Sequence, residues 1–261
     1  MKIGLCSVTF RDKSPEQIVD LAMEVSLDGI EWGGDVHVPP RDYEHAEKVG
    51  EITRSRGLEV SSYGSYYRLA DHAGNEYDFT TILGTAKKLQ APAIRVWAGM
   101  KGSNEADDHY RKKVIEDARR VADLASDEGI TVHLEYHDHT LTDTKESARR
   151  LMEEINHPNL FLYWQPANNV SVAERLASID LVKEWITNVH IFHWHSFEDR
   201  LELVSGEGEW HQYLKAIQQD GHDRYVLMEF VKDDDERQFL KDAQTLHLLR
   251  DSVRKAQGAR S

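Results

Sequence analysis

The chain has 261 residues, and its 46 Asp and Glu outnumber its 32 Lys and Arg, so the formal net charge is −14. This balance argues against a nucleic-acid partner, because phosphate binding normally needs a basic surface, although a local basic cleft is compatible with it. The single Cys excludes a disulfide framework, and no apolar run approaches the roughly 20 residues of a membrane span. Residues 1–10 predict a first strand and not a signal peptide. We therefore expect a cytoplasmic protein without a membrane partner.

Short apolar runs alternate with longer amphipathic segments along the chain. The predicted strands are Ile3–Val8, Gly29–Trp32, Leu58–Ser62, Ala93–Ala98, Ile130–Tyr136, Leu160–Trp164, Val189–Trp194 and Tyr225–Phe230. The predicted helices are Pro15–Leu27, Asp42–Arg56, Phe79–Gln90, Glu105–Glu128, Lys145–Ile155, Val172–Leu181, Trp210–Asp220 and Glu236–Gln257. Ser14 and Gln17 predict a capping box at the first helix, and Gly57 and Gly129 predict helix ends.

The eight strand–helix units favour an α/β fold with a parallel sheet, and their number fits a (β/α)₈ TIM barrel. A doubly wound open sheet is the alternative, but it usually carries a Gly-rich phosphate turn after its first strand. Residues 6–10 follow the first strand here and contain no such turn. Since no linker or low-complexity run interrupts the chain, we expect one barrel domain over residues 1–261.

Histidines gather near the ends of the predicted strands, where a barrel carries its active site. The chain has 14 His, and at least seven of them lie in or just past the second, fifth and seventh strands. Side chains alternate along a strand, so His133, Glu135 and His137 share one face, which we expect to point into the barrel. On the seventh strand, we expect the face with His193 and His195 to point inward, although the opposite face is not excluded.

Two carboxylates, Glu135 and Glu229, end apolar strands. A buried charge costs several kcal/mol unless it is compensated, so both carboxylates need a cation. Together with a carboxamide and an imidazole they would make a divalent metal site. The alternative is that both pair with Arg95 or Arg200 and that the histidines satisfy one another.

Four of the six Trp also lie at strand ends, namely Trp32, Trp97, Trp164 and Trp194. Such rings can form a wall for the apolar face of a sugar, or they can cap the core of the barrel.

The chain resembles the sugar phosphate isomerase/epimerase family of the xylose isomerase-like barrel superfamily. The matching segments are residues 29–32, 79–99, 134–137, 157–168, 190–210 and 227–230. Their order and spacing carry the resemblance more than any single motif does. At residues 134–137 the sequence reads Leu-Glu-Tyr-His where the family has Leu-Glu-Asn-His.

The resemblance implies one divalent ion held by Glu135, Gln165, His193 and Glu229, with His195 as the alternative to His193. Gln165 departs from the Asp that the family usually has, so the site carries one negative charge fewer. This change should lower the affinity for Mg²⁺ more than that for Mn²⁺, Co²⁺ or Zn²⁺.

Further residues are expected to bind a carbohydrate substrate. Positions matching His137, Asn168 and Arg200 contact substrate in relatives, and Arg200 could hold a phosphate or carboxylate; alternatively, it is an exposed loop cation. His37 is expected to bind a sugar hydroxyl or to stabilise its loop.

The resemblance implies a sugar or sugar phosphate isomerase or epimerase. The metal would stabilise an enediolate while Glu135 and Glu229 exchange protons with carbon. The alternatives are a keto-polyol dehydratase and a non-catalytic sugar-binding barrel with a degenerate metal site. A DNA-repair endonuclease on the same barrel would need a cationic groove, which a net charge of −14 disfavours. Barrel relatives commonly pair, so a homodimer is compatible with the resemblance.

Overall fold

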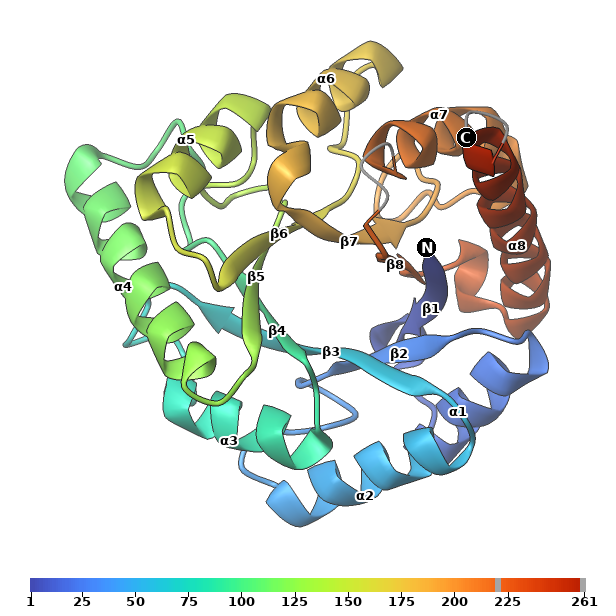
Figure 1. Cartoon of the computed structure of the whole chain (residues 1–261), viewed down its shortest axis with the longest axis horizontal. Helices are drawn as coiled ribbons and strands as arrows, with labels where there is room; N and C mark the ends of the chain where they lie inside the picture. Colours follow the sequence, from blue (N-terminus) through green and yellow to red (C-terminus); the bar gives the residue numbers. More distant parts are fainter. Residues whose placement is uncertain (219–221, 259–261) are drawn as a thin grey trace.

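Eight parallel strands close into a barrel in chain order in the computed structural model, which describes residues 1–218 and 222–258 (Figure 1). The strands are β1 (Lys2–Cys6), β2 (Gly29–Gly33), β3 (Glu59–Arg68), β4 (Ala93–Trp97), β5 (Thr131–Glu135), β6 (Leu160–Trp164), β7 (Ile186–Ile191) and β8 (Tyr225–Met228). β8 pairs with β1, so the sheet has no free edge. The predicted (β/α)₈ barrel is confirmed, and the doubly wound sheet is excluded.

The helices surround the barrel (Figure 1). They are α1 (Pro15–Glu24), α2 (Tyr43–Ser55), α3 (Phe79–Leu89), α4 (Asp108–Ser126), α5 (Lys145–Ile155), α6 (Val172–Val182), α7 (Glu207–Ile217) and α8 (Glu236–Gly258). Short 3₁₀ turns are η1 (Ser7–Phe10), η2 (Lys183–Trp185), η3 (Leu203–Gly206) and η5 (Lys232–Asp234). The capping box of Ser14 and Gln17 is present at α1. The predicted helix end at Asp220 lies outside the described residues.

The apolar core fills the layer between strands and helices. Ile30, Val132 and Leu134 are fully buried there, and their neighbours in sequence point the other way, into the barrel. No helix among the described residues is long and apolar enough to cross a membrane.

Two strands differ from their predicted bounds in ways that affect the site. β3 continues past Ser62 to Arg68, so its last residues reach the mouth of the barrel. β7 begins at Ile186 and ends at Ile191, which places His193 and His195 in the loop that follows. The predicted seventh strand was therefore placed about three residues too far along the chain.

Asp242 on α8 anchors the turn η3 and should make stability depend on pH. Its Oδ1 accepts hydrogen bonds from the backbone N–H of Leu203 at 2.9 Å and from Gln238 at 2.8 Å. Burial raises the pKa of this carboxyl to about 6. The folded state therefore binds the proton more tightly than the unfolded state, so this group's contribution to stability falls as pH rises from about 4 to above 6.

Asp242→Asn removes this titration. We expect the free energy of unfolding of the variant, relative to wild type, to increase by about 2 kcal/mol between pH 4 and pH 8. Urea denaturation at both pH values measures the difference. A relative stability that stays constant with pH would show that Asp242 titrates normally in the folded state.

Candidate active site

One side chain from each of β1 to β7, and one just beyond β8, meet inside the barrel. They are Cys6, Glu31, Ser62, Arg95, Glu135, Tyr163, His190 and Glu229. All eight are buried, and we call them the buried polar cluster. The cluster lies toward the carboxyl ends of the strands, where TIM-barrel active sites are found.

Arg95 joins two carboxylates of the buried polar cluster. Its Nε donates to Glu31 Oε1 at 2.9 Å, and its Nη1 pairs with Glu135 Oε2. Trp97 Nε1 donates to the same Glu135 oxygen at 2.5 Å, so the other oxygen of Glu135 is free to face His190. Burial would raise the pKa of Glu135, but the Arg95 guanidinium and the His190 imidazole together outweigh it and hold the pKa below its usual value. The alternative of an Arg95 pair is thus correct for Glu135, whereas Glu229 has no guanidinium partner among the described residues.

His190 lies at the centre of the cluster. Its Nδ1 is 3.1 Å from Gln165 Oε1, 3.4 Å from Glu135 Oε1 and 3.3 Å from Glu229 Oε2. Ligand atoms bound to one divalent ion at about 2.1 Å lie about 3.0–3.4 Å from one another. The three distances from Nδ1 fall in or near this range, and the ligand atoms of Glu135, His190 and Glu229 all lie within 4.8 Å of one another. On the other edge of the ring, the buried Nε2 makes no hydrogen bond and faces Glu31 Oε1 at 3.4 Å.

The charge of the cluster also fits a divalent ion. Three carboxylates and one guanidinium leave a formal charge of −2 when the imidazole is neutral. Without an ion, burial would lower the pKa of His190, but the carboxylates of Glu229 and Glu31 raise it to about 10. Burial raises the pKa of the Glu229 carboxyl. A bound divalent cation would neutralise the cluster with a neutral imidazole as ligand, so these residues fit such an ion.

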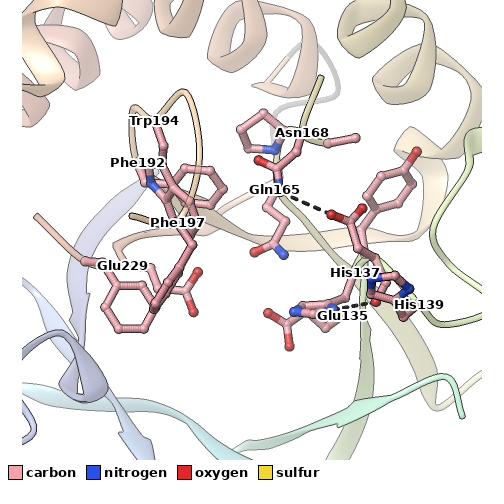
Figure 2. A pocket seen from close by; sticks show the side chains of 14 residues that line it. Glu135, His137, His139, Gln165, Asn168, Phe192, Trp194, Phe197 and Glu229 are labelled. Atoms are coloured by element: carbon pink, nitrogen blue, oxygen red, sulfur yellow. Dashed lines mark hydrogen bonds between the residues drawn. The ribbon is translucent and has the colours of Figure 1, made fainter. Parts of the chain in front are cut away.

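A hollow of about 310 Å³ opens above these groups (Figure 2). The carboxylates of Glu135 and Glu229 reach it from opposite sides, and the amide of Gln165 points between them (Figure 2). Phe192 and Trp194 form an aromatic wall on the side of Glu229. The hollow is large enough for a small polyol, and the carboxylates that line it are Glu135, Asp138 and Glu229.

The inward face predicted for β7 was the wrong one. The structure places His190, and neither His193 nor His195, beside the carboxylates. His193 lies against Gly206, where an added Cβ would come within 2.5 Å of its Nδ1, and His195 is exposed in the loop. An inward His190 is tolerated because three carboxylates surround it.

Trp32 and Trp164 do not face the hollow, in contrast to the predicted substrate wall. Trp32 donates to Thr53 of α2 at 3.2 Å, and Trp164 donates to Ser178 of α6 at 2.9 Å. Both follow an inward residue of the buried polar cluster, so alternation turns them outward. Both rings pack between the strands and the helices, which agrees with the alternative that they belong to the core.

The other two tryptophans lie at the mouth of the barrel. Trp194 lines the hollow, and Trp97 contacts Glu135 and stacks on His137 at 4.8 Å between ring centroids. His137 and Asn168 both line the hollow, as expected for substrate contacts (Figure 2). Their contact with a substrate stays a prediction.

His37 and Arg200 do not line the hollow, and each has structural partners. His37 is buried, and its Nδ1 lies 2.9 Å from Ser7 Oγ, which fits the loop-stabilising alternative. Arg200 is neither exposed nor free, because it pairs with Asp234 at 2.5 Å and packs on the rings of Phe197 and Phe230. It ties the loop after β7 to the loop after β8.

Comparison with protein families decides where this barrel belongs. The model of the xylose isomerase-like TIM barrel family matches residues 19–250. The chain belongs to this family.

Two curated relatives of this xylose isomerase-like barrel have different reactions. A 3-dehydroshikimate dehydratase from Bacillus anthracis is 30% identical over 207 residues, which cover 73% of this chain and 71% of the relative. A ketose 3-epimerase from Arthrobacter globiformis is 30% identical over 187 residues and covers 70% of this chain. The match spans only 55% of the epimerase's own length.

Solved structures share the fold. A probable 3-DHS dehydratase from Bacillus anthracis superposes with a TM-score of 0.79 at 21% identity, covering 95% of this chain and 99% of its own. Family members bind divalent ions. A Mycobacterium smegmatis barrel was solved with magnesium (TM-score 0.74, 16% identity, 97% of both chains covered), and the IOLI protein was solved with zinc (0.74, 17%, 97% and 98%).

The sequence resemblance implies His193 as the metal ligand of this xylose isomerase-like barrel, whereas the structure places His190 beside the carboxylates. A matched pair of variants distinguishes the two assignments. We expect His190→Gln to weaken Zn²⁺ binding by at least about 100-fold, because loss of a ligand should exceed the 10–100-fold effect of outer partners. His193→Gln should bind Zn²⁺ as wild type does. Competition with a chromophoric chelator measures both affinities. Weaker binding in His193→Gln alone would reverse the assignment.

Proposed function

We propose that this protein is a divalent-metal-dependent enzyme that moves a proton at the carbon next to the carbonyl of a sugar or keto-polyol. The observation that carries the proposal is the convergence of Glu135 and Glu229 on one hollow, with Gln165 and His190 between them (Figure 2). When bound, a divalent ion would polarise the substrate carbonyl. Glu135, Gln165, His190 and Glu229 would hold it.

The two carboxylates are prepared for different tasks. In the cluster without an ion, burial raises the pKa of Glu229, and its place beside the hollow suits a group that takes up and returns a proton. Glu135 has one oxygen fixed by Arg95 and Trp97, so its other oxygen keeps a constant direction toward the hollow. The aromatic wall of Phe192 and Trp194 excludes water beside Glu229.

The opposed placement of the carboxylates supports an isomerase or an epimerase. One carboxylate acting alone on one face of the substrate gives isomerisation. Two carboxylates acting from opposite faces can remove the proton on one side and return it on the other, which inverts the carbon. Glu135 and Glu229 have the opposed placement that the second scheme requires.

A dehydratase is the second candidate, and the similarity to the 3-dehydroshikimate dehydratase favours it. The first step is the same, because a proton leaves the carbon next to a carbonyl. The reaction then differs in the loss of a neighbouring hydroxyl as water, so the electron pair of the broken C–H bond forms a double bond.

The test is a substrate panel in ²H₂O, read by NMR. Free and phosphorylated ketoses and 3-dehydroshikimate are incubated with protein loaded with Mn²⁺, Co²⁺, Mg²⁺ or Zn²⁺. Deuterium at carbon without loss of water supports isomerisation or epimerisation, and an unsaturated product supports dehydration. If protein purified without chelator holds no divalent ion and exchanges no proton on any compound, the barrel is a binding protein and the proposal is wrong.

A further inference from the structure

Four arginines lie against aromatic or acidic side chains at the mouth of the barrel, and three of them reach a carboxylate. The three ion pairs are Arg11 with Asp35, Arg95 with Glu31 and Glu135, and Arg200 with Asp234. The fourth is Arg68. Within residues 1–218 and 222–258 its guanidinium has no carboxylate partner, and its Nε is buried without a hydrogen-bond acceptor.

Arg68 is held in place by contacts that do not use its guanidinium donors. It is the last residue of β3 and lies beside Trp97 in the sheet register. Its Cζ is 5.0 Å from the centre of the Trp97 ring, and its backbone N–H and C=O bond to the Asn75 side chain at 2.9 and 2.8 Å. Stacking fixes the plane of a guanidinium and leaves its N–H groups free to donate. Arg68 is therefore an oriented cation with unused donors.

A second hollow, of about 170 Å³, is lined by Arg68 together with Ser65, Tyr66 and Asn75. Two acids, Asp35 and Glu76, also line it. Asp35 pairs with Arg11, and neither acid forms an ion pair with Arg68 within the described residues. The guanidinium of Arg68 therefore keeps donors that a ligand can use.

Tyr66 and Trp97 lie between this second hollow and Glu135. Tyr66 packs edge-on against Trp97 at 5.7 Å between ring centroids, and Trp97 donates directly to Glu135. The Arg95 guanidinium lies 5.4 Å from the centre of the Tyr66 ring. A molecule held at Glu135 therefore has Trp97, Tyr66 and then Arg68 as its next neighbours on the β3 side.

We propose that Arg68 binds an anionic group, a carboxylate or a phosphate, on the end of the substrate remote from the reacting carbonyl. This inference builds on the proposed function, since it assumes a substrate between Glu135 and Glu229. A planar guanidinium matches both anions with two parallel hydrogen bonds. A protein of net charge −14 repels anions in general, so an oriented local cation is what admits an acidic substrate.

Two pairs of probes test the proposal by titration calorimetry on zinc-loaded protein. Catechol and 3,4-dihydroxybenzoate share two adjacent oxygens and differ by a carboxylate, and D-fructose and D-fructose 6-phosphate differ by a phosphate. Wild type should bind the anionic member of at least one pair about tenfold more tightly than the neutral member, as a charge-assisted hydrogen-bond pair would give. The pair that shows the preference identifies the anion.

Arg68→Gln should abolish this preference and leave the neutral probe unchanged, while Arg68→Lys should keep part of it. Arg56→Gln is the matched control, because Arg56 is an exposed arginine at the end of α2 and should keep the full preference. The proposal is wrong if wild type shows no preference in either pair, or if Arg68→Gln retains it. Repeating the titrations after removal of zinc by a chelator distinguishes failure of the proposed function from failure of the Arg68 proposal. Probe affinities that do not change without zinc contradict the metal-dependent function. The preference for the anionic probe, in contrast, tests only Arg68.

Discussion

Replacing Glu229 with Gln is expected to lower kcat by about 10²- to 10⁴-fold, the usual contribution of a general acid–base group. The amide has the same shape but cannot take up the proton. Glu135→Gln should lower kcat by a factor of the same order, because its amide cannot take up a proton either. This variant also loses the ion pair with Arg95. Rates of proton exchange and of product formation, both at saturating metal, measure the effect for each variant.

Glu198→Gln is the control for these two variants. Glu198 lies exposed in the loop after β7. Within the described residues, the hydroxyl of Ser196 is the only hydrogen-bond donor to its side chain. It should keep full activity. If Glu229→Gln kept near-wild-type proton exchange while binding metal normally, Glu229 would be a ligand only, and Glu135 would be the single proton-transfer group.

Arg95→Met should destabilise the fold by about 3–5 kcal/mol at pH 7–8, because it leaves Glu31 and Glu135 as buried charges without their cation. Chemical denaturation measures the loss. The effect should shrink at low pH, where the two carboxylates can become neutral. Arg95→Lys keeps the charge but not the fork that reaches both acids, so we expect an intermediate stability.

Arg56→Met is the control that tests whether the loss of any arginine destabilises the fold to the same extent. Its ion pair with Asp20 is exposed, and such pairs contribute about 0–1 kcal/mol. If Arg95→Met lost no more stability than Arg56→Met, the carboxylates would have to be compensated by another group, and the role of Arg95 in the buried polar cluster would be wrong.

The fold and the two central carboxylates could be predicted from local patterns. Eight alternations of apolar run and amphipathic segment require a barrel or a wound sheet, and the missing Gly-rich turn favours the barrel. Glu135 and Glu229 stand out because each ends an apolar strand, where a charge must have a partner. His133 shows the limit of such local patterns, because it shares a strand face with Glu135 but does not belong to the candidate site. It is a buried core histidine between Thr131 and Thr187, and burial lowers its pKa to about 3.

The choice of histidine could not be made from the seventh strand alone. In the run from His190 to His195, each of the two faces carries at least one imidazole and at least one apolar side chain, so either face looks acceptable. The decision comes from Glu31, Glu135 and Glu229, which belong to other strands and become neighbours only when the barrel closes. The outward orientation of the Trp32 side chain could have been predicted, since Trp32 follows Glu31 and must point the opposite way when Glu31 points into the barrel.

The buried polar cluster and the hollow above it come from different parts of the chain. The cluster is built from strand residues tied across the barrel, with Tyr163 donating to Ser62 at 2.7 Å and Asn188 donating to Tyr163 at 2.8 Å. The sides of the hollow come from loops, as with His137, Asn168 and Trp194. A loop can therefore acquire an insertion or a new side chain while the strands keep their bonding. A change in these loops could therefore alter which molecule fits the hollow without disturbing the buried polar cluster beneath it.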